Sequence, residues 1–408
     1  MSTPKLRFKD FNGNKFGKWE EIILGKVSDI RDGTHDSPTY IKEGYPLITS
    51  KNLKNGRLDF SDINYISKDD FESINKRSKV DIGDIIFGMI GTIGNPVLLE
   101  HEGFAIKNVA LIKQKNDLIN SFLIHYLQSN FFKNQVRLLN VGNTQKFLAL
   151  GQIRSIKVIK PSLEEQTKIA SFLSEVDKKI SQLTQKHQLL SQYKQGMMQK
   201  LFSQQTRFKA DDGSEFGEWE EKPLNYFLYT SKLKNKNLKY SKNEVLSVSG
   251  EIGIVNQIEL LGRSYAGVSV APYGVVEHGD IVYTKSPLKS NPYGIIKANK
   301  GKSGIVSTLY AIYKCRENII PNLVDYYFQN DMKLNHFLKP LVKKGAKNDM
   351  KVNNDHVLTG LVCFPSSIEE QTKIVNFLST IDQKIDVVSE QLEQAKLWKK
   401  GLLQQMFV

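Results

Sequence analysis

Lysine, arginine, asparagine and glutamine residues gather in several segments of this chain that are predicted to be loops. Amines and guanidinium groups neutralise phosphates, and asparagine, glutamine and arginine can each form two hydrogen bonds with one base edge in the major groove of DNA. Lys and Arg total 57 against 43 for Asp and Glu, a formal net charge of +14. This balance favours nucleic acid as a partner over a membrane surface. A basic surface that only aids solubility is the alternative.

The loop positions with this chemistry fall in both halves of the chain. In the first half the candidate DNA contacts are Thr34, His35, Lys51, Asn52, Lys76, Arg77, Asn143, Thr144, Gln145 and Lys146. In the second half they are Lys232, Lys234, Lys285, Lys289, Ser290, Asn291, Lys343, Lys344, Lys347, Asn348 and Lys351. The segments 143–146 and 347–351 are the strongest candidates, because they occupy corresponding places while their residues differ. For any single residue, a solvated loop side chain is the competing interpretation.

Fragments that resemble catalytic motifs fail in detail. Gly301-Lys302-Ser303 lacks the glycine that a phosphate-binding loop needs five positions earlier, where Ile296 stands. Asn291-Pro292-Tyr293-Gly294 lacks the second proline of the adenine methyltransferase motif, and no glycine-rich cofactor segment precedes it. The seven histidines show no metal-ligand spacing. We therefore expect no catalytic residue, metal or cofactor on this chain. A stand-alone DNA methyltransferase or nuclease with an unrecognised site is the alternative.

The loops must be held by a framework, and the clearest part of it is a repeated helical segment. Pro161-Ser162-Leu163-Glu164-Glu165-Gln166-Thr167-Lys168-Ile169 returns as Pro365-Ser366-Ser367-Ile368-Glu369-Glu370-Gln371-Thr372-Lys373-Ile374. Apolar residues then recur at spacings of four and three, which predicts one narrow apolar seam on each helix. One seam cannot be buried alone, so we expect the two helices to pair as an antiparallel coiled coil. His187, Lys194 and Lys399 interrupt the seams, and we expect both lysines to extend their amines to water. The alternative is that a polar seam residue fixes the register of the helix pair at some cost in stability.

A second repeat marks the start of each half. Arg7-Phe8-Lys9 and Trp19-Glu20-Glu21 recur 200 residues later as Arg207-Phe208-Lys209 and Trp219-Glu220-Glu221. Self-similarity at one long period indicates duplication of a whole structural unit. Because Phe202 leads directly into the second copy of this segment, Phe407 should end beside Arg7 and Phe8. The two chain ends are therefore predicted to lie close together.

Short apolar segments separate these repeats. They predict strands at residues 22–30, 46–49, 84–89, 97–99, 110–113 and 153–159, and helical spacing predicts helices at residues 120–138 and 323–341. The predicted fold class is α+β. Two mixed α/β domains, residues 1–160 and 206–364, are joined by two long antiparallel helices, residues 161–205 and 365–408, with pseudo-two-fold symmetry. A coiled-coil scaffold with incidental charge would share the helices but would not bind DNA selectively.

A variable α/β region followed by a Pro-x(2,3)-Glu-Glu-Gln-x-x-Ile helix, with both repeated, resembles the specificity subunit of type I restriction–modification systems over the whole chain. Asp32-Gly33-Thr34-His35 and Gly83-Asp84-Ile85 are similar to segments common in the target recognition domains of this family. The resemblance implies a non-catalytic DNA reader. Each domain would take one half of a split, asymmetric site in double-stranded DNA, while the helices set the gap.

The resemblance also implies protein partners. These are two methyltransferase subunits and endonuclease–translocase subunits, on which S-adenosylmethionine, ATP and Mg would be bound. Two identical partners need surfaces that are repeated. We expect these on exposed outer faces of the helices, at Glu164, Glu165, Gln166, Glu369, Glu370 and Gln371. Compensation of the helix dipole by the acidic pairs is an alternative role.

The cellular compartment is predicted from cysteine content and hydropathy. Cys315 and Cys363 are the only cysteines, which argues for a reducing compartment and against a disulfide framework. The N-terminal residues have no apolar core of the signal-peptide type. No run approaches the roughly 18 apolar residues of a membrane span. We expect a cytoplasmic protein.

Overall fold

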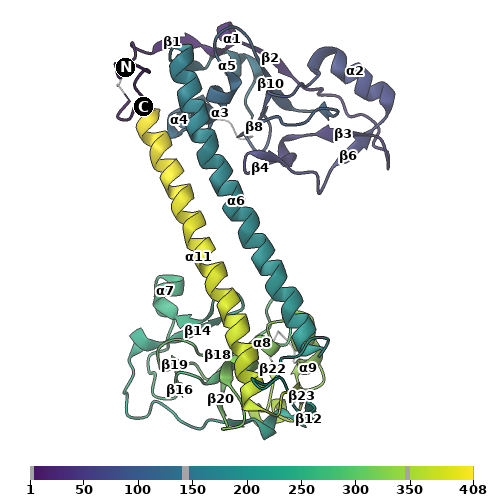
Figure 1. The fold of residues 1–408 in the computed structure, drawn as a ribbon, viewed down its shortest axis with the longest axis vertical. Coiled ribbons are helices and arrows are strands. Elements are labelled where there is room, and N and C mark those ends of the chain that lie inside the picture. Colours follow the sequence, from purple (N-terminus) through teal and green to yellow (C-terminus); the bar gives the residue numbers. More distant parts are fainter. Residues whose placement is uncertain (1–3, 140–146, 345–349, 408) are drawn as a thin grey trace. The chain divides into compact units, whose positions relative to one another are not determined.

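A computed structural model of the chain describes residues 4–139, 147–344 and 350–407. It divides into two compact units, the first formed by Met1–Lys186 with Val388–Val408 and the second by His187–Val387. Each unit contains one β-rich part, one half of helix α6 (Leu163–Phe202) and one half of helix α11 (Ile368–Met406) (Figure 1).

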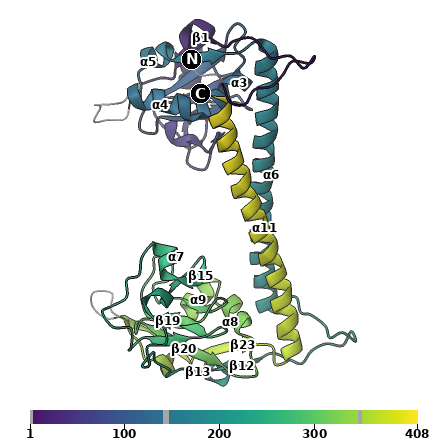
Figure 2. The ribbon, with the colours of Figure 1, turned by 90° about the vertical axis from the view of Figure 1, so that its left-hand side faces the viewer.

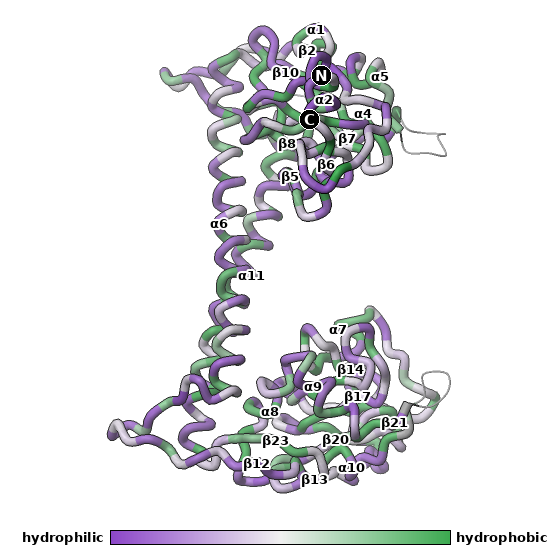
Figure 3. Tube along the Cα trace, turned by 90° about the vertical axis from the view of Figure 1, so that its right-hand side faces the viewer, coloured by the Kyte–Doolittle hydropathy of each residue, from purple (hydrophilic) through white to green (hydrophobic). Residues whose placement is uncertain are grey.

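The two long helices pair antiparallel, as predicted. In the first unit, Leu173 near the start of α6 shares a buried cluster with Met406 at the end of α11. In the second unit, Leu201 near the end of α6 shares a cluster with Leu378 near the start of α11. Short apolar stretches alternate with polar ones along the traces of both helices (Figure 3). This pattern is the seam expected of paired helices.

The first unit is built around a four-stranded antiparallel sheet in the order β2-β10-β7-β8. Its central strand β7 is buried along its whole length. Ile85 and Phe87 enter one apolar cluster while Ile86 enters another, because successive side chains of a strand point to opposite faces. The strands of this unit are β1 (Glu20–Ile23), β2 (Ser28–Asp32), β3 (Tyr45–Ile48), β4 (Leu53–Lys54), β5 (Arg57–Leu58), β6 (Asn64–Ile66), β7 (Ile85–Gly88), β8 (Gly94–Leu98), β9 (Ala105–Ile106), β10 (Val109–Gln114) and β11 (Lys157–Lys160). The helices are α1 (Leu24–Val27), η1 (Ser50–Asn52), α2 (Lys68–Ser78), α3 (Asn120–Gln128), α4 (Asn130–Leu139) and α5 (Leu150–Ser155).

Three of the predicted element boundaries in the first unit are wrong. The predicted strand 22–30 is interrupted by α1, whose Leu24 and Val27 lie three positions apart and are both buried. The predicted helix 120–138 breaks into α3 and α4 at Ser129, whose hydroxyl accepts a hydrogen bond from the amide of Phe132 at 3.2 Å. The predicted strand 153–159 begins only at Lys157, because α5 occupies the preceding residues.

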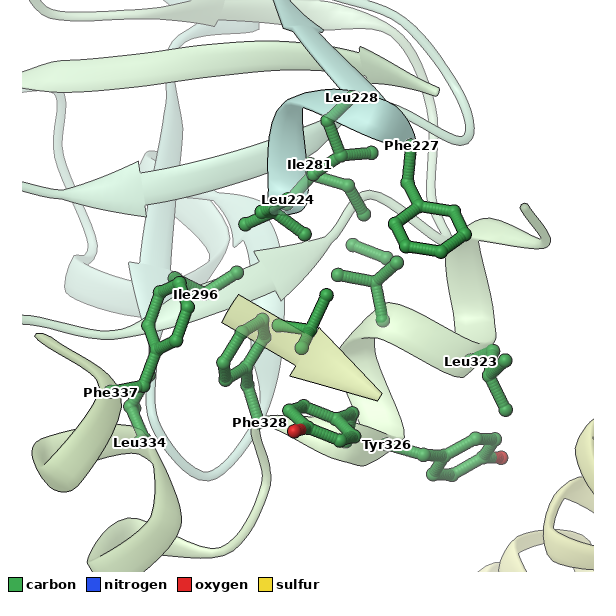
Figure 4. Close-up of a cluster of buried hydrophobic side chains, with 14 of the residues drawn as sticks. Leu224, Phe227, Leu228, Ile281, Ile296, Leu323, Tyr326, Phe328, Leu334 and Phe337 are labelled. Atoms are coloured by element: carbon green, nitrogen blue, oxygen red, sulfur yellow. The ribbon is translucent and has the colours of Figure 1, made fainter. Parts of the chain in front are cut away.

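The second unit repeats the first sheet. Its order β13-β20-β17-β18 matches β2-β10-β7-β8, and the pair β12-β23 matches β1-β11. Its core gathers the sheet, α8 and α9 around buried aromatic residues such as Tyr326, Phe328 and Phe337 (Figure 4). The strands are β12 (Glu220–Pro223), β13 (Leu228–Thr230), β14 (Leu246–Ser249), β15 (Gly253–Asn256), β16 (Gly274–Val276), β17 (Ile281–Thr284), β18 (Ile296–Ala298), β19 (Gly304–Val306), β20 (Tyr310–Cys315), β21 (Lys343–Lys344), β22 (Met350–Lys351) and β23 (Leu361–Phe364). The helices are η2 (Leu224–Tyr226), η3 (Lys242–Glu244), α7 (Gln257–Leu261), α8 (Pro321–Tyr327), α9 (Asp331–Leu338) and α10 (Asn354–Val357).

The two chain ends meet in the first unit, as predicted (Figure 2). The backbone amides of Lys5 and Leu6 donate to the carbonyl oxygen of Gln405 at 2.9 and 3.1 Å. The rings of Trp19 and Phe407 lie 6.4 Å apart. The last turn of α11 therefore holds the first segment of the chain in place.

The seam lysines do not extend into water, so that expectation is wrong. Lys194 Nζ lies 2.6 Å from Asp382, and Lys399 Nζ lies 2.6 Å from Asp177. The two lysine side chains are only 16% and 15% exposed. An ammonium group that is this far buried requires a partner, and a carboxylate on the opposite helix supplies one in each unit.

Candidate nucleic-acid interface

In the first unit, two predicted DNA contacts, Thr34 and Arg77, line one pocket of about 480 Å³. The pocket lies between α2 and the loop that follows β2. Its lining is mostly hydroxyl and charged groups. The lining residues are Thr34, Asp36, Ser37, Pro38, Thr39, Asp70, Ser73, Ile74, Arg77 and Ser78.

A buried carboxylate organises this region. Asp32 is 6% exposed and accepts a hydrogen bond from the guanidinium group of Arg77. His35 Nε2 lies 2.9 Å from the same carboxylate, and His35 Nδ1 lies 2.8 Å from Asn108 Oδ1. Gly33 is required between them, because a Cβ there would lie 2.3 Å from the carbonyl oxygen of Ile106. His35 and Arg77 are thereby fixed while more than half of each side chain stays exposed.

The other described candidates of the first unit lie on α2 and on η1. Lys76 is exposed on α2 beside Arg77. Lys51 is exposed on η1 and pairs with Asp62 at 3.0 Å. Asn52 is only 2% exposed, and its amide group donates to the carbonyl oxygens of Asp59 and Asp62. Asn52 therefore holds its own loop together and, contrary to expectation, presents no group to a base edge.

In the second unit, Lys232 and Lys234 lie in the segment after β13, and Lys285 directly follows β17. Lys232 and Lys234 are exposed. Lys285 is half-buried and donates to Asn354 Oδ1 at 3.4 Å. Burial, and next to it the charge of Lys234, lowers the pKa of Lys285. A phosphate bound here would relieve the repulsion between these two ammonium groups.

Residues 289–291 in the loop after β17 are three further candidates, and two of them lie at the surface. Lys289 and Ser290 are exposed. Asn291 is only 6% exposed, and its side-chain amide donates to Asp331 at 2.9 Å. Its own carbonyl oxygen accepts from the amides of Leu288 and Gly294. Asn291 therefore closes this loop, and the prediction that it contacts a base is wrong.

The two strongest candidate segments fall largely outside the described residues. Residues 143–146 do, as do Lys347, Asn348 and the side chains of Lys344 and Lys351. The strands that flank the second segment are described, and β21 pairs antiparallel with β22. Lys343 is exposed on β21. The contacts predicted for these segments stay predictions.

The pocket also contains residues that the sequence pattern did not single out. Ser37, Thr39 and Ser73 line it, and Lys107 Nζ donates to Ser37 Oγ at 2.8 Å. A single serine or lysine after a strand is too common to be a signal. Their proximity arises only when the loop after β2 folds against α2.

The Glu-Glu-Gln repeat is mainly a structural device, which corrects part of the partner-binding prediction. Glu165 and Glu370 were expected to be exposed, but each is fully buried at 0%. Arg7 donates to both oxygens of Glu165, at 2.9 and 2.6 Å, and Trp19 Nε1 donates at 2.8 Å. Arg207 and Trp219 hold Glu370 in the same way. This explains why arginine, tryptophan and glutamate are repeated together.

The glutamines of the repeat are also buried and hydrogen-bonded within their own unit. Gln166 and Gln371 are both 0% exposed, so the expectation that they face partners is also wrong. Gln166 accepts from the amide of Ile119 at 3.0 Å and donates to the carbonyl oxygens of Asp117 and Pro161. Gln371 makes the corresponding three hydrogen bonds in the second unit. Glu164 and Glu369 are exposed, and partner contact stays a prediction for them.

The repeated Gly-Asp dipeptide is structural as well. Gly83 and Gly279 adopt φ of +87° and +85°, a region that favours glycine. The carboxylates of Asp84 and Asp280 accept hydrogen bonds from the backbone amides of Asp81 and Glu277. Each carboxylate also pairs with a lysine on the neighbouring strand of the sheet. This pattern fixes the turn that leads into β7 in the first unit and into β17 in the second.

Among residues 4–139, 147–344 and 350–407, no group of three or more His, Cys, Asp or Glu side chains could hold a metal ion. In the same part of the chain, no helix is both long and apolar enough to cross a bilayer.

Two copies of one sheet frame, paired helices and different polar loops on each copy define a two-module recognition protein. Residues 17–192 match the family model of the type I restriction modification DNA specificity domain. A Methanocaldococcus jannaschii protein assigned as the MjaX specificity subunit of a type I restriction enzyme is 26% identical over 415 residues, covering 94% of this chain and 92% of the relative.

Solved structures share the fold over almost the whole chain. The crystal structure of the S subunit of a type I restriction–modification system from M. genitalium has a TM-score of 0.63 at 16% identity and covers 100% of this chain and 99% of that one. A chain from a study of complex assembly and conformational transition of the type I system has a TM-score of 0.52 at 15% identity, covering 96% and 98%.

These findings identify the family. The chain belongs to the specificity subunits of type I restriction–modification systems. It is the DNA specificity subunit of such a system, with two target recognition domains and a helical spacer, and is itself non-catalytic.

Proposed function

We propose that this subunit reads a split, asymmetric DNA site, with the β-rich part of each unit reading one half-site and α6 and α11 setting the gap between them. The observation that carries the proposal is that the two units share one sheet topology but present different polar side chains. Both units repeat the strand order of the central sheet, yet the first presents His35 and Arg77 around a buried carboxylate, while the second presents Lys234 and Lys285. Two readers with different loops recognise two different sequences.

The lengths of the helices suit a spacer. They span 40 and 39 residues, or about 60 Å at 1.5 Å per residue. Two related readers can contact the same side of B-DNA when their centres lie about 34 Å, one helical turn, or a multiple of it apart. Helices of this length are on the scale of one to two turns of DNA.

The proposed partners follow from the family and from the non-catalytic role. The likeness to a chain studied in the assembled type I system supports a complex with two methyltransferase subunits and with endonuclease–translocase subunits. S-adenosylmethionine, ATP and Mg would then be bound by those subunits. This chain would contribute DNA contacts and no catalytic group.

Methylation assays test the proposal. The purified chain is incubated with labelled S-adenosylmethionine and DNA, alone and with the methyltransferase subunit of its own system. We expect label in DNA only with the added subunit, and we expect the modified adenines or cytosines to lie within one two-part motif. Methyl transfer by the isolated chain would refute the non-catalytic role, and a continuous motif would refute two separate readers.

A further inference from the structure

The two seam lysines and their carboxylate partners form a matched set. Lys399 pairs with Asp177 in the first unit, and Lys194 pairs with Asp382 in the second, both at 2.6 Å. Asp382 lies 205 residues after Asp177, and Lys399 lies 205 residues after Lys194. The duplication has therefore placed one acid and one base on each helix, and each pairs with the opposite kind on the other helix.

Both pairs specify the same register. The step from 177 to 194 along α6 is 17 residues, and the step back from 399 to 382 along α11 is also 17 residues. Each lysine is held by a second group from the β-rich part of its unit. Lys399 donates to Gln128 at the end of α3 at 2.6 Å, and Lys194 donates to Gln329 just after α8 at 3.0 Å. The ion pairs are thus fixed to the modules as well as to the helices.

The apolar seams cannot by themselves select the direction and the offset of the two paired helices. A seam that repeats every seven residues remains buried when one helix slides by a heptad, and it also allows a parallel pair. A parallel pairing of equivalent positions would place Asp177 beside Asp382 and Lys194 beside Lys399. A slide by one heptad would leave both buried ammonium groups without a carboxylate. Both alternatives are penalised by charge, which is how paired helices select a partner arrangement.

We propose that Asp177, Lys194, Asp382 and Lys399 form a register lock, which selects the antiparallel direction and a single offset of α6 against α11. These four positioning residues touch no DNA in this account. They determine which gap the two readers span, and this consequence rests on the proposed spacer function. The lock itself is a property of helix pairing and can be measured without DNA.

Charge reversal and its rescue test the lock. The K194D/K399D variant places two carboxylates against each other in both pairs. Adding D177K/D382K restores both pairs with reversed polarity. The matched control is K179D/K384D, because Lys179 and Lys384 are also 205 residues apart and exposed on the same helices. The control changes the net charge as much as K194D/K399D does but leaves the lock intact.

The first readout is helix pairing. Cysteines replace Phe172 on α6 and Trp398 on α11, whose rings lie 6.0 Å apart in the first unit, and Cys315 and Cys363 become serine. A short bifunctional maleimide then reports whether these two positions meet. We expect the yield of the cross-link to fall about tenfold in K194D/K399D, the population change that about 1.4 kcal/mol produces, and to return in the four-residue variant. Unchanged yield in K194D/K399D, or no recovery in the four-residue variant, would overturn the lock.

The second readout is the gap itself. With the methyltransferase subunit present, methylated sites should show one gap length for the parent, the control and the four-residue variant, and no activity or several gap lengths for K194D/K399D. A single parental gap in K194D/K399D would overturn the lock. If the parent methylates no two-part site at all, the proposed function fails, while the cross-link still decides the lock.

Discussion

Lengthening both long helices by one heptad tests the spacer most quantitatively. Residues 178–184 of α6 would be duplicated after Thr184, and residues 383–389 of α11 after Ser389. Each duplicated segment repeats its own seam residues, so the apolar face stays in phase. Both insertions fall between the two ion pairs of the lock, so both steps of 17 residues lengthen equally and all four charges can still meet.

The expected change in the gap follows from helix geometry. Seven residues add about 10.5 Å at 1.5 Å per residue, which corresponds to about three base pairs at 3.4 Å per pair. We expect a gap longer by about three base pairs and both half-sites unchanged. The assay is sequencing of methylated positions in cells that carry the lengthened subunit with its methyltransferase partner.

An insertion in only one helix is the matched control. It leaves the steps between the charges unequal, so only one of the two ion pairs can form. We expect that variant to lose defined two-part methylation. An unchanged gap in the double insertion, or a change in either half-site sequence, would refute the ruler. Equal activity of the single and double insertions would refute the account of the register.

Three further predictions concern DNA affinity, stability and pH. Replacing Lys234 and Lys285 with glutamine should weaken binding of the assembled methyltransferase to every DNA sequence. It should also reduce the slope of log K against log salt by about 2, because two phosphate contacts are lost. An unchanged slope in fluorescence titrations would count against contact of these lysines with DNA. Glu165→Gln should lower the free energy of unfolding by about 3 kcal/mol, since it breaks a buried ion pair, whereas Glu164→Gln, at an exposed position, should cost less than about 0.5 kcal/mol in chemical denaturation. Burial, and next to it the charge of Lys399, lowers the pKa of His125 from 6.5 to about 3. Because the folded state keeps this histidine neutral, stability should fall as pH drops from 6.5 towards 3, by up to about 1.4 kcal/mol per pH unit.

The control for the pH prediction comes from the duplication. Tyr326 occupies the place of His125 in the second unit and donates to Asp382 at 2.7 Å. His125→Tyr should therefore remove that part of the pH dependence while leaving the first unit folded. Thermal unfolding across the pH range checks this, and a slope that persists unchanged in the variant would assign it to other groups.

The frame of the protein could be predicted from the sequence because duplication makes long-range structure visible. Two seams at one spacing predict a helix pair, and two copies of the segment around Trp19 predict that the chain ends meet. The boundaries within residues 22–30 and 120–138 could not be predicted, because a one-turn helix and a serine cap leave the apolar pattern almost unchanged. Tertiary contacts decide such short elements.

The roles of individual polar residues were harder to predict, for a physical reason. Glu164 and Glu165 are adjacent and equally charged, yet one is exposed and the other is fully buried. Only the buried one meets Arg7 and Trp19, and the signal that could have shown this is the repetition of all three residue types together. Asn52 gives no such signal. A short amide side chain can contact a base or close a loop, and only the fold decides which.

The most direct test of the central claim is an exchange of one reader. Residues 206–364 would be replaced with the corresponding segment of a family member whose methylated site has been mapped, with α6 and α11 left intact. Sequencing of methylated DNA should then show one half-site replaced by that of the donor, with the other half-site and the gap unchanged. Changes in both half-sites, or in neither, would contradict the claim that each unit reads its own half of the site.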